Sequence, residues 1–249
     1  MDLRETGDGP RHPWELARAR FLIGQLRAHK VTATAHRVLD GGAGDAWFAR
    51  QLLGALGPQA RVTCWDAEYD AETAQRIEAA GDGRIACATA LPAGPFDLVT
   101  LLDVAEHVED DHTFVRRIVV DALRPAGWLL LTVPAWQGLY TSHDVFLRHH
   151  RRYSMDQGRA LLTGAGLELV ASGGLFHSLL APRALQKLKE SVTEVDPARH
   201  KPGITWSAGP RVTAAVRRAL AVDNALSAAA SAVGVSLPGL SFWALARKP

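Results

Sequence analysis

Short apolar runs alternate with helical segments along much of this chain, and this alternation limits its fold more than any other feature. The apolar runs, which are typical of buried strands, are residues 37–40, 61–65, 84–88, 96–102 and 128–133. The segments with helical periodicity or helix-start signals are residues 13–29, 46–56, 71–80 and 110–123. Strands that alternate with helices need crossover connections, so we expect a mostly parallel sheet covered by helices on both faces.

The pattern changes after residue 140. We expect a polar loop, then a helix over 155–163, a strand over 167–171 and a last strand over 240–246. Residues 179–235, between the last two strands, are mostly helical, with interruptions near Pro197 and Pro202. The sequence therefore predicts one α/β domain over residues 1–249, with a doubly wound, mostly parallel seven-stranded sheet. The helical insertion at 179–235 is expected to form a cap or a partner surface, and residues 1–10 a disordered start.

Composition excludes several other classes of protein. The 249 residues are 47% hydrophobic, which fits one large core. The formal net charge is only +2, and the densest basic stretch, residues 149–152, is too short to indicate a nucleic-acid partner. No apolar run reaches the length of a membrane span, and peripheral membrane contact is not expected. Cys64 and Cys87 lie in expected buried strands, which favours reduced thiols and a cytoplasmic protein. A monomer or a homodimer is expected.

The segment that follows the first strand is the most informative one for function. It ends the strand with Asp40 and continues through Gly42 and Gly44 into a helix, which lets the backbone approach a ligand closely. A dinucleotide-binding loop needs a third glycine where Trp47 stands, so a nicotinamide cofactor is disfavoured. Asp66 ends the next strand, where folds of this kind hold a carboxylate for ribose hydroxyls. Alternatively, Asp40 and Asp66 are helix caps or turn residues.

This spacing resembles the first motif of class I S-adenosylmethionine-dependent methyltransferases, Asp-x-Gly-x-Gly-x-Gly. Ala46 replaces the last glycine, and we expect it to need only an ordinary helical conformation. Residues 96–108 resemble the fourth-strand motif of the same family, and residues 123–128 resemble its turn before the fifth strand. The resemblance covers residues 14–171 and is closest to the subgroup with small-molecule, quinone and lipid methyltransferases.

The resemblance implies S-adenosylmethionine as the cofactor. Trp14 and Arg18, one helical turn apart, match the start of this subgroup, and Arg18 is expected to pair with the cofactor's carboxylate. The alternative is a solvated arginine over a packed Trp14. Many relatives carry an acid after the third strand for adenine, which this chain lacks, so backbone groups or Thr89 are expected there. The implied cofactor contacts are Trp14, Arg18, Asp40, Gly42, Ala43, Gly44, Asp66, Ala67, Thr89, Leu102, Asp103, Val104 and His107.

A dense polar cluster follows the fifth strand and resembles a signature of part of this subgroup. It offers His143 as a general base, Asp144 to orient it, and Tyr153 as a further catalytic candidate. The residues expected to bind an anionic acceptor are His149, Arg151 and Arg152. Alternatively, the cluster only locks the loop to the sheet. A metal site from His143, Asp144 and His149 is conceivable, but nothing in the sequence fixes ligand geometry, so none is predicted.

The predicted function is methyl transfer from S-adenosylmethionine to a small-molecule acceptor. The acceptor atom stays open, because oxygen, nitrogen and carbon nucleophiles share this scaffold. Two alternatives remain. One is a non-methylating reaction on the same fold, such as a decarboxylation or a cyclisation. The other is a binding protein with a vestigial cofactor pocket, which the intact set of Asp40, Gly42, Gly44 and Asp66 disfavours.

Overall fold

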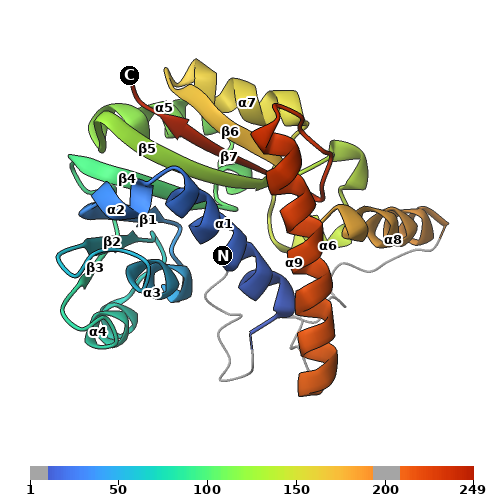
Figure 1. Ribbon diagram of the computed structural model, residues 1–249, viewed down its shortest axis with the longest axis horizontal. Coiled ribbons are helices and arrows are strands. Elements are labelled where there is room, and N and C mark those ends of the chain that lie inside the picture. The colour runs from blue at the N-terminus through green and yellow to red at the C-terminus, as the bar shows by residue number, and fades with distance from the viewer. Residues whose placement is uncertain (1–10, 193–207) are drawn as a thin grey trace.

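A seven-stranded sheet forms the centre of the structure, a computed structural model that describes residues 11–192 and 208–249 (Figure 1). The predictions for residues 1–10, Pro197 and Pro202 lie outside the described residues. The strands are β1 (Arg37–Gly41), β2 (Arg61–Trp65), β3 (Ile85–Ala88), β4 (Phe96–Leu102), β5 (Leu123–Pro134), β6 (Glu168–Leu175) and β7 (Ser241–Arg247). The α-helices are α1 (Pro13–Ala28), α2 (Val31–Thr34), α3 (Trp47–Leu53), α4 (Ala71–Ala79), α5 (Asp111–Asp121), α6 (Ser142–Phe146), α7 (Met155–Gly164), α8 (Leu180–Val192) and α9 (Pro210–Ala232).

The sheet confirms the predicted fold class. Its strand order is β3-β2-β1-β4-β5-β7-β6, and the first five strands in this order are parallel. Only β7 is antiparallel to its two neighbours. The order reverses between β1 and β4, and ligands of such sheets bind beyond the carboxyl ends of the strands at this switch point. The loops after β1 and β4 are therefore where a site is expected.

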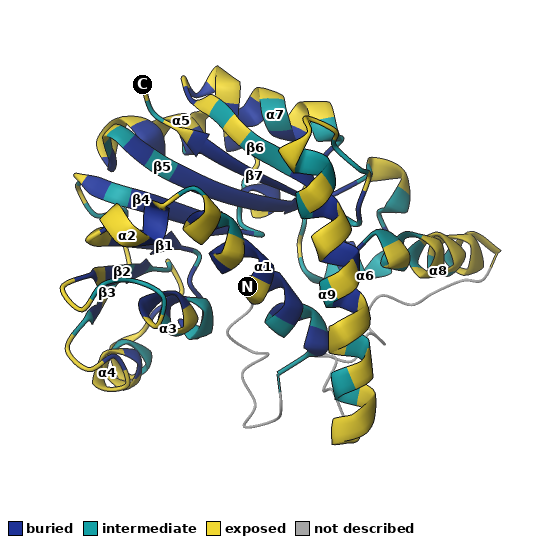
Figure 2. Cartoon of the chain, in the orientation of Figure 1, coloured by how far each residue is buried: buried dark blue, intermediate teal, exposed yellow. Residues whose placement is uncertain are grey.

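Alternate residues of each central strand pack into two separate cores. Leu39 and Leu101 point to the face covered by α5 and α7. Val38 and Leu98 point to the opposite face, which α1, α3 and α9 cover. Both faces are buried along β4, β5 and β7 (Figure 2), as a parallel sheet between two helical layers requires.

Several element boundaries differ from the sequence prediction. The fifth strand begins at Leu123 instead of residue 128, because the segment expected as a turn pairs with Phe96 through an irregular register. The third helix ends at Leu53, three residues early. The sixth strand continues to Leu175, because its glycine-containing half pairs with β7. At the two strands, sheet pairing overrides local residue preference.

The helices of residues 179–235 play two different parts. Helix α9 packs along α1 and β6 and buries Leu220, Asn224 and Ser227. Helix α8 buries none of its residues and extends from the body beside α6, with the 3₁₀ turns η3 (Gln137–Leu139) and η4 (His177–Leu179) at its base (Figure 1). Among the described helices, none is long and apolar enough to cross a membrane. Cys64 is buried, Cys87 is half-buried, and both are free thiols.

Two glycines in helices provide a matched test of this packing. In Gly158→Ala the added methyl group would overlap the buried ring of Phe242, so we expect the free energy of unfolding to fall by about 1–3 kcal/mol. In Gly24→Ala nothing lies within 4 Å of the added carbon, and we expect a gain of about 0.5–1 kcal/mol from helix preference alone. Urea unfolding of both variants measures this, and changes of the same sign would contradict the described packing.

Candidate active site

The loop after β1 folds back onto the end of β2. The backbone N–H groups of Gly42 and Ala43 both donate to the carbonyl of Trp65, at 2.7 and 3.3 Å. Gly42 has a positive φ of 63°, and a side chain there would overlap Val104, which follows β4. Glycine is therefore required at position 42 both by the backbone conformation and by the close approach of the next loop.

Ala46 corrects one expectation from the sequence. It does not adopt an ordinary helical conformation, because its φ of 58° and ψ of 21° place it in the left-handed region at the N-cap of α3. A non-glycine residue in this region costs about 1–2 kcal/mol. The family's glycine at this position therefore has a conformational reason, and this chain keeps the same backbone with alanine.

Asp66 ties the glycine loop to the second strand. Its carboxylate accepts hydrogen bonds from the backbone N–H groups of Gly44 and Glu68, each at 3.0 Å. Ala67 next to it is exposed, and so is Thr89, which lies just beyond β3. The backbone N–H of Asp66 in turn donates to the carbonyl of Ala88 at 3.0 Å. The three predicted cofactor positions on this side of the loop thus lie at neighbouring strand ends.

Asp40 is buried with one carboxylate oxygen unpartnered. The parallel register sets Thr100 of β4 beside Asp40, and the hydroxyl of Thr100 donates to Asp40 Oδ1 at 2.5 Å. Asp40 Oδ2 is buried without a partner in the protein. Burial raises the pKa of Asp40 to about 6, against the opposing effect of the Thr100 hydrogen bond. A buried acceptor without a partner costs free energy, and a ligand that supplies a hydrogen-bond donor would offset that cost.

Arg18 reaches across from α1 to Asp103 at the end of β4. Its guanidinium pairs with Asp103 and lies 4.5 Å from the centre of the Trp14 ring. Burial works to raise the pKa of Asp103, but Arg18 and a 2.9 Å hydrogen bond from Thr132 outweigh it and hold the pKa below its ordinary value. Arg18 is only 8% exposed, so the alternative of a solvated arginine over Trp14 is wrong.

A pocket opens between α1 and the glycine loop. Five of its lining residues were expected from the sequence to contact a cofactor, namely Arg18, Asp40, Gly42, Ala43 and Leu102. The others that line it are Glu15, Ala19, Trp47 and Phe48. Sequence reasoning used Trp47 only to exclude a dinucleotide, whereas the structure brings its side chain to the pocket wall.

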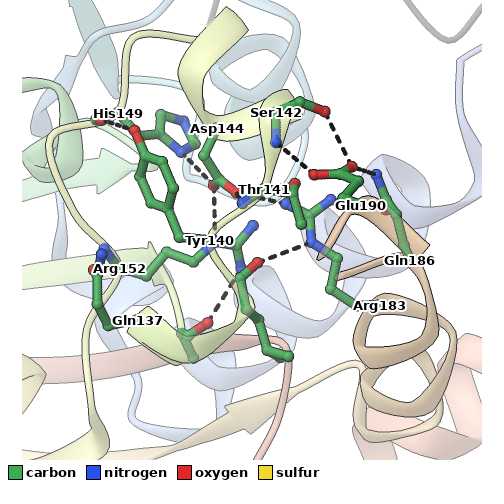
Figure 3. A network of polar contacts seen from close by, with 12 residues as sticks. Gln137, Tyr140, Thr141, Ser142, Asp144, His149, Arg152, Arg183, Gln186 and Glu190 are labelled. Carbon is green, nitrogen blue, oxygen red and sulfur yellow. Dashed lines mark hydrogen bonds and ion pairs between the residues drawn. The ribbon is translucent and has the colours of Figure 1, made fainter. Parts of the chain in front are cut away.

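Asp144 is the centre of a polar network that joins α6, the loop after it and α8 (Figure 3). Its side chain is fully buried and accepts from His149 Nδ1 at 2.9 Å, Arg152 Nε at 2.8 Å and Arg183 Nη2 at 2.6 Å. Burial opposes its ionisation, but these partners outweigh burial and hold the pKa of Asp144 below its ordinary value. Asp144 thus orients His149, while His143 lies half-buried in the first turn of α6.

The other predicted residues of this cluster hold the chain in place. The hydroxyl of the buried Tyr153 donates to Asp111 at 2.6 Å, and burial followed by this contact raises its pKa. Arg151 donates to the same carboxylate at 3.2 Å and to the carbonyl of Glu109. Arg152 is buried and also donates to the carbonyl of Ala135 at 3.1 Å. These contacts match the alternative in which the cluster locks the loop to the sheet.

Several residues of the site carried no clear signal in the sequence. Thr100 could have been found from the register of two parallel strands, but Arg183 and Glu190 come from α8, far along the chain. Glu190 accepts from the backbone N–H and hydroxyl of Ser142, at 2.8 and 3.0 Å, and so ties α8 to α6. Glu106 is different, because it lies in the fourth-strand motif that the sequence showed; the structure places it, fully buried, in the 3₁₀ turn η2 (Ala105–His107).

Comparisons with known proteins agree with this geometry. The methyltransferase domain family matches residues 14–172, which is more than half of the chain, so the chain belongs to this family. Its members generally use S-adenosylmethionine. No curated protein sequence matches the chain.

Solved structures share the fold at low sequence identity. A protein from Galdieria sulphuraria, provisionally assigned as a sarcosine dimethylglycine methyltransferase, is 18% identical with a TM-score of 0.58, over 94% of this chain and 86% of its own. The (4+2)-cyclase SpnF is 20% identical with a TM-score of 0.57, over 98% and 85%. An S-adenosylmethionine-dependent methyltransferase from Mesorhizobium loti is 16% identical with a TM-score of 0.54, over 90% and 96%. At these identities the likeness shows the fold alone.

Replacing Asp40 tests how much its buried charge destabilises the folded protein. At pH 7 we expect the free energy of unfolding of Asp40→Asn to exceed that of the wild type by about 1–3 kcal/mol. The amide carries no buried charge and keeps an acceptor for the Thr100 hydroxyl. Between pH 3.8 and about 6, Asp40 holds its proton in the folded state but not in the unfolded state. The wild-type protein should therefore lose stability as the pH rises through this range, and Asp40 should cause no further loss above it. Urea unfolding at pH 4 and pH 7 measures both, and equal stabilities at pH 7 would contradict the unpartnered charge.

Proposed function

We propose that the protein transfers a methyl group from S-adenosylmethionine to a small-molecule acceptor. The observation that carries this proposal is the pocket between α1 and the glycine loop. It is lined by Asp40, which has one buried oxygen without a partner, and Asp66 holds the loop beside it. Membership of the methyltransferase domain family supports it. The bound cofactor would supply an electrophilic methyl group on a sulfonium, so the protein has mainly to align the acceptor and remove a proton where one is present.

The residues present fit this cofactor. We assign the ribose hydroxyls to Asp66, because a carboxylate accepts two hydrogen bonds from a vicinal diol. An ammonium group on the methionine part would give Asp40 Oδ2 the donor that it lacks. Arg18 can hold Asp103 and a cofactor carboxylate together, because a guanidinium has five N–H donors. Thr89 and nearby backbone groups are assigned to adenine.

On the acceptor side, we place the residues that select the substrate around α6 and α8. Helix α9 is packed into the main body, so the cap function expected of residues 179–235 falls to α8, which stands on α6 through Ser142 and Asp144. His143, in α6, remains our candidate for the general base. His149, Arg151 and Arg152 give this side positive or donor character that suits an anionic acceptor, although their described contacts are within the protein.

Cofactor binding is the first test. S-adenosylhomocysteine should bind and NAD should not, and Asp66→Ala should weaken S-adenosylhomocysteine binding by about 1.5–3 kcal/mol, since a charged hydrogen-bond partner is lost. Glu72→Ala, which removes an exposed carboxylate from the first turn of α4, is the control and should leave affinity unchanged. Isothermal titration calorimetry gives both constants. Binding of NAD without S-adenosylhomocysteine would refute the assignment.

The reaction itself needs a separate test, because a (4+2)-cyclase shares the fold. We expect incubation with methyl-labelled S-adenosylmethionine and a metabolite extract to transfer label to a small molecule and to form S-adenosylhomocysteine. His143→Ala should lower this turnover at least tenfold while cofactor affinity stays within twofold, as for a lost general base. A transformed metabolite without label would favour the cyclisation alternative, and a bound cofactor without any product would favour the vestigial pocket.

A further inference from the structure

Three potential metal ligands converge just beyond the end of β4, and only one of them belongs to the trio that the sequence offered. Among the described residues, one ligand atom each of Glu106, His107 and His149 lies within 4.8 Å of the other two. The imidazole rings of His107 and His149 are 4.7 Å apart in an edge-on arrangement. Ligands around a tetrahedral Zn²⁺ lie about 3.4 Å apart, from bonds of about 2.0–2.1 Å, so small side-chain movements would close the set.

The buried carboxylate of Glu106 is the strongest indication of a bound metal ion at this cluster. Both of its carboxylate oxygens are buried without a hydrogen-bond partner, and its side chain has no exposed surface. Buried carboxylates in folded proteins are normally paired or bound to a metal. Its backbone is fixed independently, because the carbonyl of Glu106 accepts from the backbone N–H of His150 at 2.7 Å.

His149 is oriented as metal-binding histidines are. Its Nδ1 lies 2.9 Å from the carboxylate of Asp144, which is held by Arg152 and Arg183 and can only accept. With Nδ1 donating, the lone pair of Nε2 is free on the other side of the ring. A carboxylate that receives the second nitrogen of a histidine is the usual outer partner of a metal ligand. His107 is exposed, which leaves a route for an ion to enter.

We propose that Glu106, His107 and His149 form a site for a divalent transition metal of the Zn²⁺ type. Two imidazoles and one carboxylate are a ligand set found in catalytic zinc sites, where the fourth position stays open. Glu106 follows Asp103 by three residues, so the site lies at the same carboxyl edge as the pocket. The open position would bind a hydroxyl oxygen of the acceptor and favour loss of its proton to His143 or to water, which makes the acceptor a hydroxyl compound. The O–CH3 bond would then form as the S–CH3 bond of the cofactor breaks and S-adenosylhomocysteine leaves. This last step rests on the proposed function.

Zn²⁺ titration of the metal-stripped protein tests the site. We expect one Zn²⁺ per chain by calorimetry and by elemental analysis after dialysis. Glu106→Gln and His149→Ala should each weaken binding at least tenfold, while His112→Ala, which removes an exposed histidine of α5, should bind as the wild type does. Glu106→Gln has the same shape as the wild-type residue and cannot carry a charge in its buried position, so it should fold. Circular dichroism and thermal unfolding check that each variant does. Equal Zn²⁺ affinity in all four proteins would overturn the site.

The open position has its own probe. Acetohydroxamate, a small oxygen chelator, should bind the Zn²⁺-loaded protein and not the metal-stripped one. Failure to bind the loaded protein would overturn the role at the acceptor. Titration with S-adenosylhomocysteine on the same samples separates the two proposals. Zn²⁺ binding without S-adenosylhomocysteine binding would sink the proposed function and leave the metal site. The reverse result would sink the metal site alone.

Discussion

The buried charge of Asp144 is the interaction on which the arrangement of α6, α8 and the loop between α6 and α7 depends. A carboxylate without exposed surface must be compensated, and removing one partner of such a group typically costs about 3–5 kcal/mol. Its partners come from three separate parts of the chain: Thr141 just before α6, His149 and Arg152 in the loop between α6 and α7, and Arg183 in α8. Each of these segments is short or poorly buried alone, and the shared charge fixes their relative positions.

A chain of side-chain contacts also connects Asp144 to the end of β4. His149 is held by Asp144 and faces His107, and His107 directly follows Glu106 at the end of β4. On the far side of the same strand end, Asp103 is held by Arg18 from α1. Asp103 and Glu106 are three residues apart, yet their surroundings affect the charge of each side chain in opposite ways. Asp103 is paired with a cation, while burial and the nearby Asp103 charge raise the pKa of Glu106 well above its ordinary value.

The sequence predicted those features that depend on local pattern. Strand and helix alternation was enough for the sheet, and the spacing of Asp40, Gly42, Gly44 and Asp66 was enough to predict a tight glycine loop between β1 and α3. Contacts between distant segments could not be read in this way: the pairing of Arg18 with Asp103, or of Asp144 with Arg183, depends on topology rather than spacing. The left-handed conformation of Ala46 was missed for another reason, since alanine rarely adopts it and the surrounding structure imposes it.

The position of β7 has a consequence for how the chain is made. This strand lies between β5 and β6, and within the described sheet it is the neighbour that β6 pairs with. On the ribosome, β6 emerges well before β7, with α8 and α9 still to be synthesised between them. During that interval the edge of the nascent sheet at β5 is unpaired, and β6 has no neighbouring strand. Unpaired strand edges of this kind can pair with another chain. We expect the rate of productive folding to be governed by the arrival of β7, which makes this the step where a chaperone would have most effect.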